Sequence, residues 1–193
     1  AQTSDAPLQL EIDKAEGVYL FSPSGKKYLD LISGISVSNV GHSHPKVVDA
    51  VCQQANKYMH LMVYGEYVQY PQVKLAVKLA GLLPKSLQSI FFVNSGSEAV
   101  EGAIKLAKRY TGRYEVFAFK NAYHGSTHGA LSLMGNEEQK RAFRPLLTGI
   151  QHLEFNNLID IDKISTKTAC VVVEPVQGEA GVRVPGQEYL KKL

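Results

Sequence analysis

The sequence predicts an α/β fold with a mostly parallel sheet covered by helices. From residue 89 onward, short apolar runs typical of buried strands alternate with longer amphipathic segments. Glycine, asparagine and proline separate these segments, as expected between the units of a β-α-β chain. Strands joined through helices in this way run parallel and lie next to each other.

The first 60 residues predict a hairpin followed by a helix. Residues 17–21 would pair with residues 27–31 across the turn 22–25, which holds Pro23 and Gly25. Pro45 would begin a helix that runs to about Met59. The expected inner face of this helix consists of Val47, Val48, Val51 and Ala55. An aromatic loop with Tyr64, Tyr67 and Tyr70 follows. We expect one domain segment over residues 1–60 and a second domain beginning at residue 61.

The second part of the chain predicts regular alternation. A helix over residues 73–83 lies between Pro71 and Pro84. Strands are predicted over residues 89–94, 115–120, 150–155 and 169–174, and helices over 97–112, 137–143 and 160–165. The apolar stripe of the helix 97–112 holds Ala99, Ala103, Leu106, Ala107 and Tyr110, with Val100 and Ile104 beside it. Glu101 and Lys105 would form an i,i+4 pair on its polar side.

The junction between the strand 89–94 and the helix 97–112 is a candidate phosphate site. The first N–H groups of a helix have no partner within the helix and carry partial positive charge, so they attract a phosphate. Gly96 would allow a tight turn and a close backbone approach. The alternative is that Ser95 and Glu98 form only a capping box, S-x-x-E, without a ligand.

Four motifs in order resemble the class III aminotransferases, which depend on pyridoxal phosphate. Residues 94–108 resemble the phosphate-binding segment of that family, and residues 41–45, 123–125 and 174–181 resemble three of its other motifs. The resemblance runs from about residue 17 to residue 193. Residues 29–37 are most similar to the acetylornithine and ornithine aminotransferase branch.

This resemblance implies a fold-type I enzyme with pyridoxal 5'-phosphate as its cofactor. Residues 1–60 would belong to the small domain and residues 61–193 to the first part of the large, cofactor-binding domain. The intact enzyme would be a cytoplasmic homodimer that transfers an amino group from an ω-amino donor, such as ornithine or acetylornithine, to a 2-oxo acid. A glutamate-1-semialdehyde aminomutase-type enzyme and a non-catalytic phosphate-binding or assembly module are the alternatives.

The resemblance also assigns residues to the cofactor. Ser95, Gly96 and Ser97 would bind the phosphate, and Tyr123 would stack on the pyridine ring. His124 belongs to the same signature, with Gly125 allowing the backbone to approach the cofactor. Glu174 ends a buried strand, where a carboxylate often lines a site. A core aromatic at Tyr123 and a solvated turn at Glu174 are the structural alternatives.

Three further residues bear on the substrate. Glu179 would pair with an arginine from elsewhere in the family's chain. Ser126 stands where acetylornithine and 4-aminobutyrate relatives have an arginine that binds a carboxylate, and Ile35 stands where ornithine relatives have a tyrosine. Both differences leave the amino donor open between ornithine, acetylornithine, another ω-amino acid, a lysine-like compound and a simple amine.

Composition agrees with a soluble enzyme and excludes other classes. The net charge is +3, and no apolar run is long enough for a membrane span. We expect no signal peptide, no nucleic-acid partner and no metal, because His124 and His128 lie in a glycine-rich stretch where a rigid helix is not expected. Cys52 and Cys170 have apolar neighbours and are expected to be buried thiols.

Family members are roughly twice as long as this chain of 193 residues. Their Schiff-base lysine lies in a part that has no counterpart here, so no catalytic residue is assigned. We expect an N-terminal part of an aminotransferase that is inactive by itself.

Overall fold

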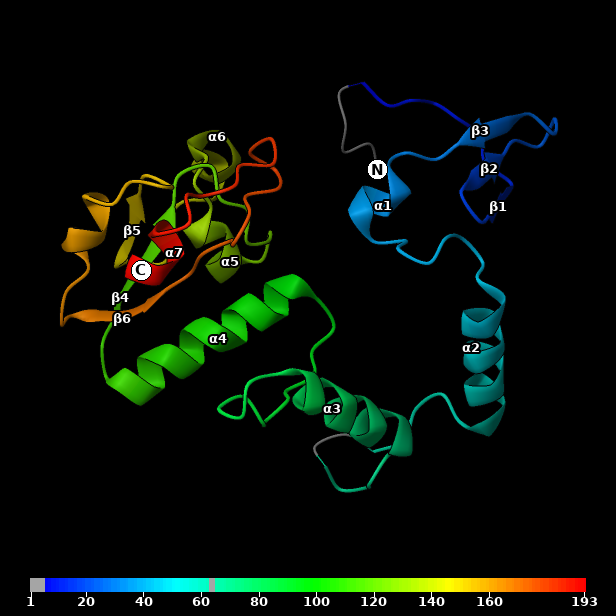
Figure 1. The fold of residues 1–193 in the computed structure, drawn as a ribbon, viewed down its shortest axis with the longest axis horizontal. Helices are drawn as coiled ribbons and strands as arrows, with labels where there is room; N and C mark the ends of the chain where they lie inside the picture. The colour runs from blue at the N-terminus through cyan, green and yellow to red at the C-terminus, as the bar shows by residue number, and fades with distance from the viewer. Residues whose placement is uncertain (1–5, 63–64) are drawn as a thin grey trace. The chain divides into compact units, whose positions relative to one another are not determined.

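A computed structural model describes residues 6–62 and 65–193, which form two compact units (Figure 1). The first unit spans residues 1–77 and the second spans residues 78–193. The domain division at residue 60 concerns the intact enzyme and stays a prediction. Tyr64 of the expected aromatic loop lies outside the described residues.

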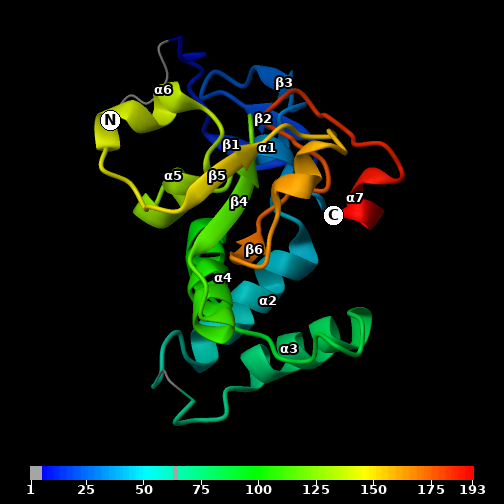
Figure 2. The ribbon, with the colours of Figure 1, turned by 90° about the vertical axis from the view of Figure 1, so that its left-hand side faces the viewer.

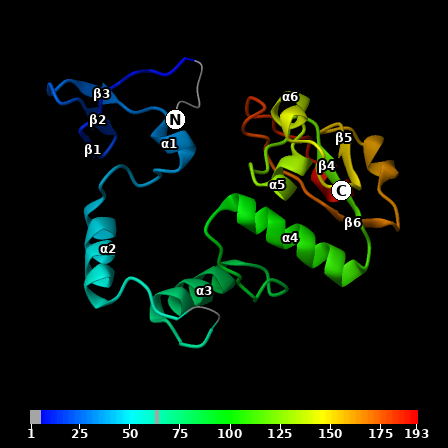
Figure 3. The same cartoon turned by 180° about the vertical axis from the view of Figure 1, so that it is seen from behind.

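The first unit begins with a small antiparallel sheet in the order β1-β2-β3 (Figure 3). Its strands are Lys14–Glu16 (β1), Tyr19–Phe21 (β2) and Lys27–Leu29 (β3). The predicted hairpin is confirmed as β2 and β3, with Tyr19 opposite Leu29. β1 is an addition, because its three residues, Lys-Ala-Glu, carry no apolar pattern that would mark a strand.

After the sheet the backbone makes a left-handed turn at α1, Ser33–Ser36. All four residues have φ between 53° and 61°, a region that costs a non-glycine residue about 1–2 kcal/mol. Asp30 compensates by accepting hydrogen bonds from the N–H groups of Ile32 and Ser33, both at 2.9 Å, and by pairing with His42 Nε2 at 2.6 Å. The hydrogen bond from Ser33, and then the one from His42, holds the pKa of Asp30 below its ordinary value.

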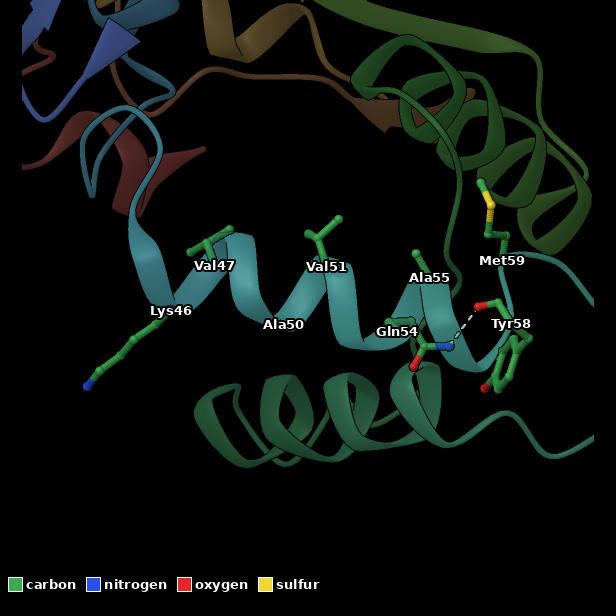
Figure 4. Close-up of a pocket in the computed structure, with 8 residues that line it drawn as sticks. All are labelled: Lys46, Val47, Ala50, Val51, Gln54, Ala55, Tyr58 and Met59. Carbon is green, nitrogen blue, oxygen red and sulfur yellow. Dashed lines mark hydrogen bonds between the residues drawn. The ribbon is translucent and has the colours of Figure 1, made fainter.

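Both predicted helices of this region are confirmed, as α2, Pro45–Lys57, and α3, Tyr70–Leu82. The expected inner face of α2 is nevertheless exposed, and it borders an open cavity of about 570 Å³ (Figure 4). Val47, Val51 and Ala55 point to the same side of the helix there. Cys52 is also exposed, so the prediction of two buried thiols is wrong for this residue. Amphipathic spacing marks an apolar face but does not supply the element that covers it.

The second unit is a three-layer α/β structure (Figure 2). Its parallel sheet has the order β5-β4-β6, with β4 at Glu115–Phe119, β5 at Ile150–Leu153 and β6 at Thr168–Val171. The predicted mostly parallel sheet with covering helices is therefore confirmed. The strands are shorter than predicted because hydrogen-bonded pairing, unlike the apolar runs, ends at Phe119, Leu153 and Val171.

Each face of this sheet carries its own core. Val116 and Ala118 pack with Ile104 of α4, Gly96–Thr111, and with Leu133 of α5, His128–Leu133. Phe117 and Phe119 point to the other face. There they pack against the 3-10 helix η2, Asp160–Lys163, and the final helix α7, Tyr189–Lys192. The alternation of buried residues along β4 thus divides the core into two layers. A short helix, α6, Glu137–Lys140, continues into the 3-10 turn η1, Arg141–Phe143.

Three expectations for this unit are wrong. Residues 89–94 form no strand, and Phe91 is 84% exposed, because none of the described strands pairs with this segment. The packed face of α4 is formed by Val100 and Ile104, whereas Leu106 and Tyr110 of the predicted stripe are exposed. A helix forms at α5 despite Gly129, since packing against α4 and the sheet outweighs the low helix propensity of glycine.

Among the described residues, no helix combines the length and the apolar character needed to cross a membrane.

Candidate functional site

The predicted phosphate turn is the N-terminus of α4. Ser95 is the N-cap, and its hydroxyl accepts a hydrogen bond from the N–H of Glu98 at 3.1 Å. The carboxylate of Glu98 turns back and accepts the N–H of Asn94 at 2.7 Å. A capping arrangement therefore exists, with the glutamate reaching one residue further than in the usual capping box. It leaves the N–H groups of Gly96 and Ser97 without an acceptor among the described residues.

Of the two features predicted for Gly96, a tight turn and a close backbone approach, the turn does not require glycine. It does not need a positive φ, and a Cβ added to it would meet nothing within 4 Å. The backbone of this turn could therefore be built with another residue. What a side chain at Gly96 would change is the open space in front of the helix N-terminus, where the absence of a Cβ lets a ligand approach the N–H groups.

The second part of the site is the loop that follows β4 at the carboxyl end of the sheet. Tyr123 is 46% exposed, so its ring is accessible rather than part of the core. Its N–H donates a hydrogen bond of 3.1 Å to Oε2 of Glu174, which follows the neighbouring strand β6. Tyr123 and Glu174, which follow two adjacent parallel strands, are thus joined by a direct hydrogen bond. They lie at the carboxyl ends of the strands, where open α/β sheets bind their ligands.

The phosphate turn and this loop border one cavity of about 390 Å³. Its lining residues are Ser95, Gly96, Ser97, Val100, Tyr123, His124 and Gly125. Five of the six residues predicted to bind the cofactor therefore lie around the same space, although more than 20 residues of sequence separate the two segments. Glu174 is the sixth and reaches the loop through Tyr123.

The polar groups of this cavity suit an anion attached to a flat ring. Two free backbone N–H groups and the hydroxyls of Ser95 and Ser97 can donate to a phosphate at the positive end of a 16-residue helix. His124 is 9% exposed, and its Nε2 is buried without a hydrogen-bond partner among the described residues. Burial, and to a smaller degree the nearby His152, lowers the pKa of His124, which favours the neutral imidazole.

Two more cavities meet the first one at Tyr123. One, of about 350 Å³, contains Ser126 together with Leu131, Met134 and Phe143. The other, of about 410 Å³, contains Glu179 together with Asn121, Asn136 and Gln139. No lysine or arginine lines either cavity among the described residues. Ser126 and Glu179, both predicted near the substrate, thus flank the residue predicted to hold the cofactor ring.

Ile35, the third residue predicted near the substrate, belongs to the first unit, whereas the three cavities are lined by residues of the second unit. It lies in the left-handed turn α1 of the first unit, and its side chain is 77% exposed. Its role toward the substrate stays a prediction.

Sequence reasoning missed two side chains that fix the site. Gln177 is buried and donates from Nε2 to the carbonyl of Lys120 at 2.9 Å, tying the segment of Glu179 to the end of β4. Glu101 does not form the predicted surface pair with Lys105, and instead contacts the start of α5. Gln177 lies inside the family motif at residues 174–181, so the motif could have identified it. Glu101 was predicted on the polar side of its helix, and no sequence feature indicated a contact with another helix.

The described residues contain no group of three or more histidine, cysteine, aspartate or glutamate side chains placed to bind a metal ion. His124 precedes α5 and His128 begins it, so the two do not share a helix face. His128 Nε2 lies 3.0 Å from the carbonyl oxygen of Pro145.

Comparisons with known proteins point to one family. The family model of class-III aminotransferases matches residues 1–193. Acetylornithine aminotransferase from Methanopyrus kandleri is 42% identical over 179 residues, which are 92% of this chain and 46% of the relative. The chain spans about half the length of the curated relatives it matches.

Two solved structures show the same fold. Adenosylmethionine-8-amino-7-oxononanoate aminotransferase from Methanocaldococcus jannaschii has a TM-score of 0.89 and 33% identity, over 96% of this chain and 46% of that one. Taurine:2-oxoglutarate aminotransferase from Bifidobacterium kashiwanohense was solved in complex with PLP and glutamate. It has a TM-score of 0.85 and 28% identity, and the match covers 99% of this chain and 48% of that one.

Proposed function

Because the chain belongs to the class-III aminotransferase family, we propose that it forms the phosphate-binding and ring-binding part of an aminotransferase. The whole enzyme would transfer an amino group from an ω-amino donor to a 2-oxo acid with pyridoxal 5'-phosphate as cofactor. The observation that carries the proposal is the shared cavity of about 390 Å³, in which the N-terminus of α4 and Tyr123 meet.

Each part of the cavity has a task that its chemistry supports. The N–H groups of Gly96 and Ser97, with the serine hydroxyls, would hold the phosphate dianion without a full positive charge. Tyr123 would lie against the ring and keep its plane fixed. His124 would form part of the cavity wall beside the bound molecule. When bound, pyridoxal phosphate supplies the electron sink for amino transfer, and the protein supplies its orientation.

The cavities on either side of Tyr123 would receive the substrates. Glu179 places a carboxylate in a cavity otherwise lined by neutral groups, which favours a cationic group of the donor. The partly apolar cavity at Ser126, which His128 also lines, has no guanidinium among its described residues to bind a carboxylate. Ornithine, acetylornithine or a similar ω-amino compound is the proposed donor, in agreement with the names of relatives such as the acetylornithine aminotransferase of M. kandleri. We take the whole enzyme to be a cytoplasmic homodimer.

Titration of the chain with pyridoxal phosphate, followed by cofactor absorbance, tests the site. Saturable binding that inorganic phosphate displaces is the expected result. Gly96→Val should abolish it while leaving the fold intact, because the new side chain would enter open space in front of the N–H groups. Gly102→Val is the matched control, since it places the same side chain on α4 at a position that also meets nothing within 4 Å and does not line the cavity. Equal affinity of Gly96→Val and the parent would show that this turn is not the phosphate site.

A further inference from the structure

The start of α5 takes its cap from another helix. Thr127 is the N-cap residue of α5, yet its own side chain accepts no hydrogen bond from the helix. The acceptor is Oε1 of Glu101, in the second turn of α4. It lies 2.8 Å from Thr127 Oγ1, 2.7 Å from the N–H of Gly129 and 3.2 Å from the N–H of Ala130. One carboxylate oxygen therefore satisfies two helix N–H groups and the hydroxyl of the cap residue.

The backbone is shaped to let this carboxylate in. A Cβ built on Gly129 would lie 2.1 Å from Oε2 of Glu101, far inside contact distance. Glycine at this position costs helix propensity, and the close approach of Glu101 is what its missing side chain permits.

A second contact joins the same two segments one turn earlier. The N–H of Ser126 donates to Ser97 Oγ at 3.3 Å, beside the predicted phosphate turn. Between them, Ser97 and Glu101 are four residues apart and lie on one face of α4. They hold residues 126–130, which directly follow Tyr123 and His124. The separation of the phosphate turn from the ring-binding loop is therefore controlled by two side chains of α4.

Glu101 carries its charge in this position. Burial acts to raise its pKa, but the hydrogen bonds from Thr127, Gly129 and Ala130, together with the nearby His128, lower the pKa of Glu101 overall. An ionised acceptor forms stronger hydrogen bonds to N–H groups than a neutral one, and it suits the positive end of a helix.

From this geometry we infer that Glu101 is a positioning residue that sets the distance between the phosphate-binding turn and the ring-binding Tyr123. The inference rests on the proposed function, because it concerns how the same cavity is held in shape. Glu101 does not line that cavity, so it acts through α5 and the loop before it. A ligand that needs only the phosphate turn should be insensitive to it, whereas a ligand that spans turn and ring should depend on it.

Two ligands separate these cases, inorganic phosphate for the turn alone and pyridoxal phosphate for turn and ring together. Glu101→Ala in the 193-residue chain should weaken pyridoxal phosphate binding by about tenfold or more and change phosphate binding by less than about twofold. Glu101→Gln should restore most of the affinity, since its amide oxygen can accept from the same donors. Thr127→Val, which removes only the hydroxyl donor, should weaken pyridoxal phosphate binding less than Glu101→Ala. Lys105→Ala, on the exposed side of α4, is the control.

The outcomes are distinguishable. If the parent chain binds neither ligand, the proposed site fails, and the inference fails with it. If the parent binds both but Glu101→Ala binds pyridoxal phosphate like the parent, the proposed function stands and the positioning role is wrong. A parallel loss of both ligands in Glu101→Ala, with circular dichroism showing a folded protein, also overturns the inference. Should Glu101→Ala not fold, Thr127→Val decides it, since an unchanged ratio of the two affinities in that variant would contradict the role.

Discussion

Gly125 and Ser97 are packed so closely that a Cβ on Gly125 would lie 2.1 Å from Ser97 Oγ and 3.0 Å from Ser97 Cα. Gly125 also has φ at +122°, a conformation that other residues rarely adopt. The family signature suggested that this glycine admits the cofactor. In the structure it allows the close approach of Ser97 in the phosphate turn, which brings the loop after β4 against the start of α4; its approach to the cofactor stays a prediction.

Gly125→Ala should therefore disturb both stability and binding. The steric conflict with Ser97 and the unfavourable φ together should lower the free energy of unfolding by about 1–3 kcal/mol and weaken pyridoxal phosphate binding. Denaturant unfolding and cofactor titration measure the two effects. Gly178→Ala is the control, because a Cβ there meets nothing within 4 Å and its φ is not positive. Equal behaviour of the two variants would mean that the contact between Gly125 and Ser97 is not required.

Two histidines of the second unit, the buried His124 and the half-buried His152, predict a pH dependence of stability. Burial lowers the pKa of His124, and the nearby His152 lowers it further. Burial also lowers the pKa of His152, with a smaller contribution from Lys140. Both are thus favoured in the neutral form when folded, whereas in the unfolded chain they titrate near pH ~6.5. Their contribution is complete above that pH and is lost as the pH falls toward their folded pKa values, so the free energy of unfolding should decrease between about pH 7 and pH 5.

Denaturant midpoints at several pH values measure this slope. Replacing both residues, as His124→Gln and His152→Gln, should flatten the curve over that range even if the overall stability is lower. His60→Gln, at an exposed position in the first unit, should leave it unchanged. Parallel curves for the parent and the double variant would show that other groups cause the decrease.

Ser126→Arg should increase the affinity of the cavity beside Tyr123 for carboxylates. The cavity has room at about 350 Å³, and Ser126 is exposed, so a guanidinium can enter without a change in the core. Bidentate pairing should tighten 2-oxoglutarate binding by about tenfold, measured by calorimetry or by chemical-shift changes. Ser24→Arg adds the same charge at an exposed turn of the first unit. If that variant binds 2-oxoglutarate equally well, the gain is a general effect of charge and Ser126 does not face the substrate.

The chain of 193 residues should show no amino transfer, even with excess pyridoxal phosphate. No lysine lines the three cavities around Tyr123 among the described residues. Lys120 is the lysine nearest in sequence to Tyr123. Its hydrogen bond and ion pair with Glu154 raise its pKa, which makes the amine a poor nucleophile. Borohydride reduction followed by peptide mapping should find only scattered, substoichiometric labelling. A single stoichiometrically labelled lysine together with measurable amino transfer would contradict this expectation.

The sequence by itself predicted most of the local elements of the second unit and named residues that lie around one cavity. Ser95 and the amphipathic run after it predicted α4 and its cap, and the apolar runs predicted the three parallel strands. The motifs around Gly96, Tyr123 and Glu174 predicted residues that the fold brings together at the carboxyl ends of β4 and β6. These features depend on residues close in sequence, or on the general rule that parallel strands present their carboxyl ends at one edge of a sheet.

Tertiary structure decided which faces are covered and which polar groups meet. Periodicity predicted an apolar stripe on α4 that includes Tyr110. In the structure the adjacent face with Ile104 packs against the sheet, and Tyr110 is exposed. The apolar run at Phe91 formed no strand, because a strand needs a partner that its own sequence cannot specify. Glu101 had the pattern of a solvated surface residue and became the cap of α5. A carboxylate can satisfy N–H groups anywhere within its reach, and only the folded chain determines which ones lie there.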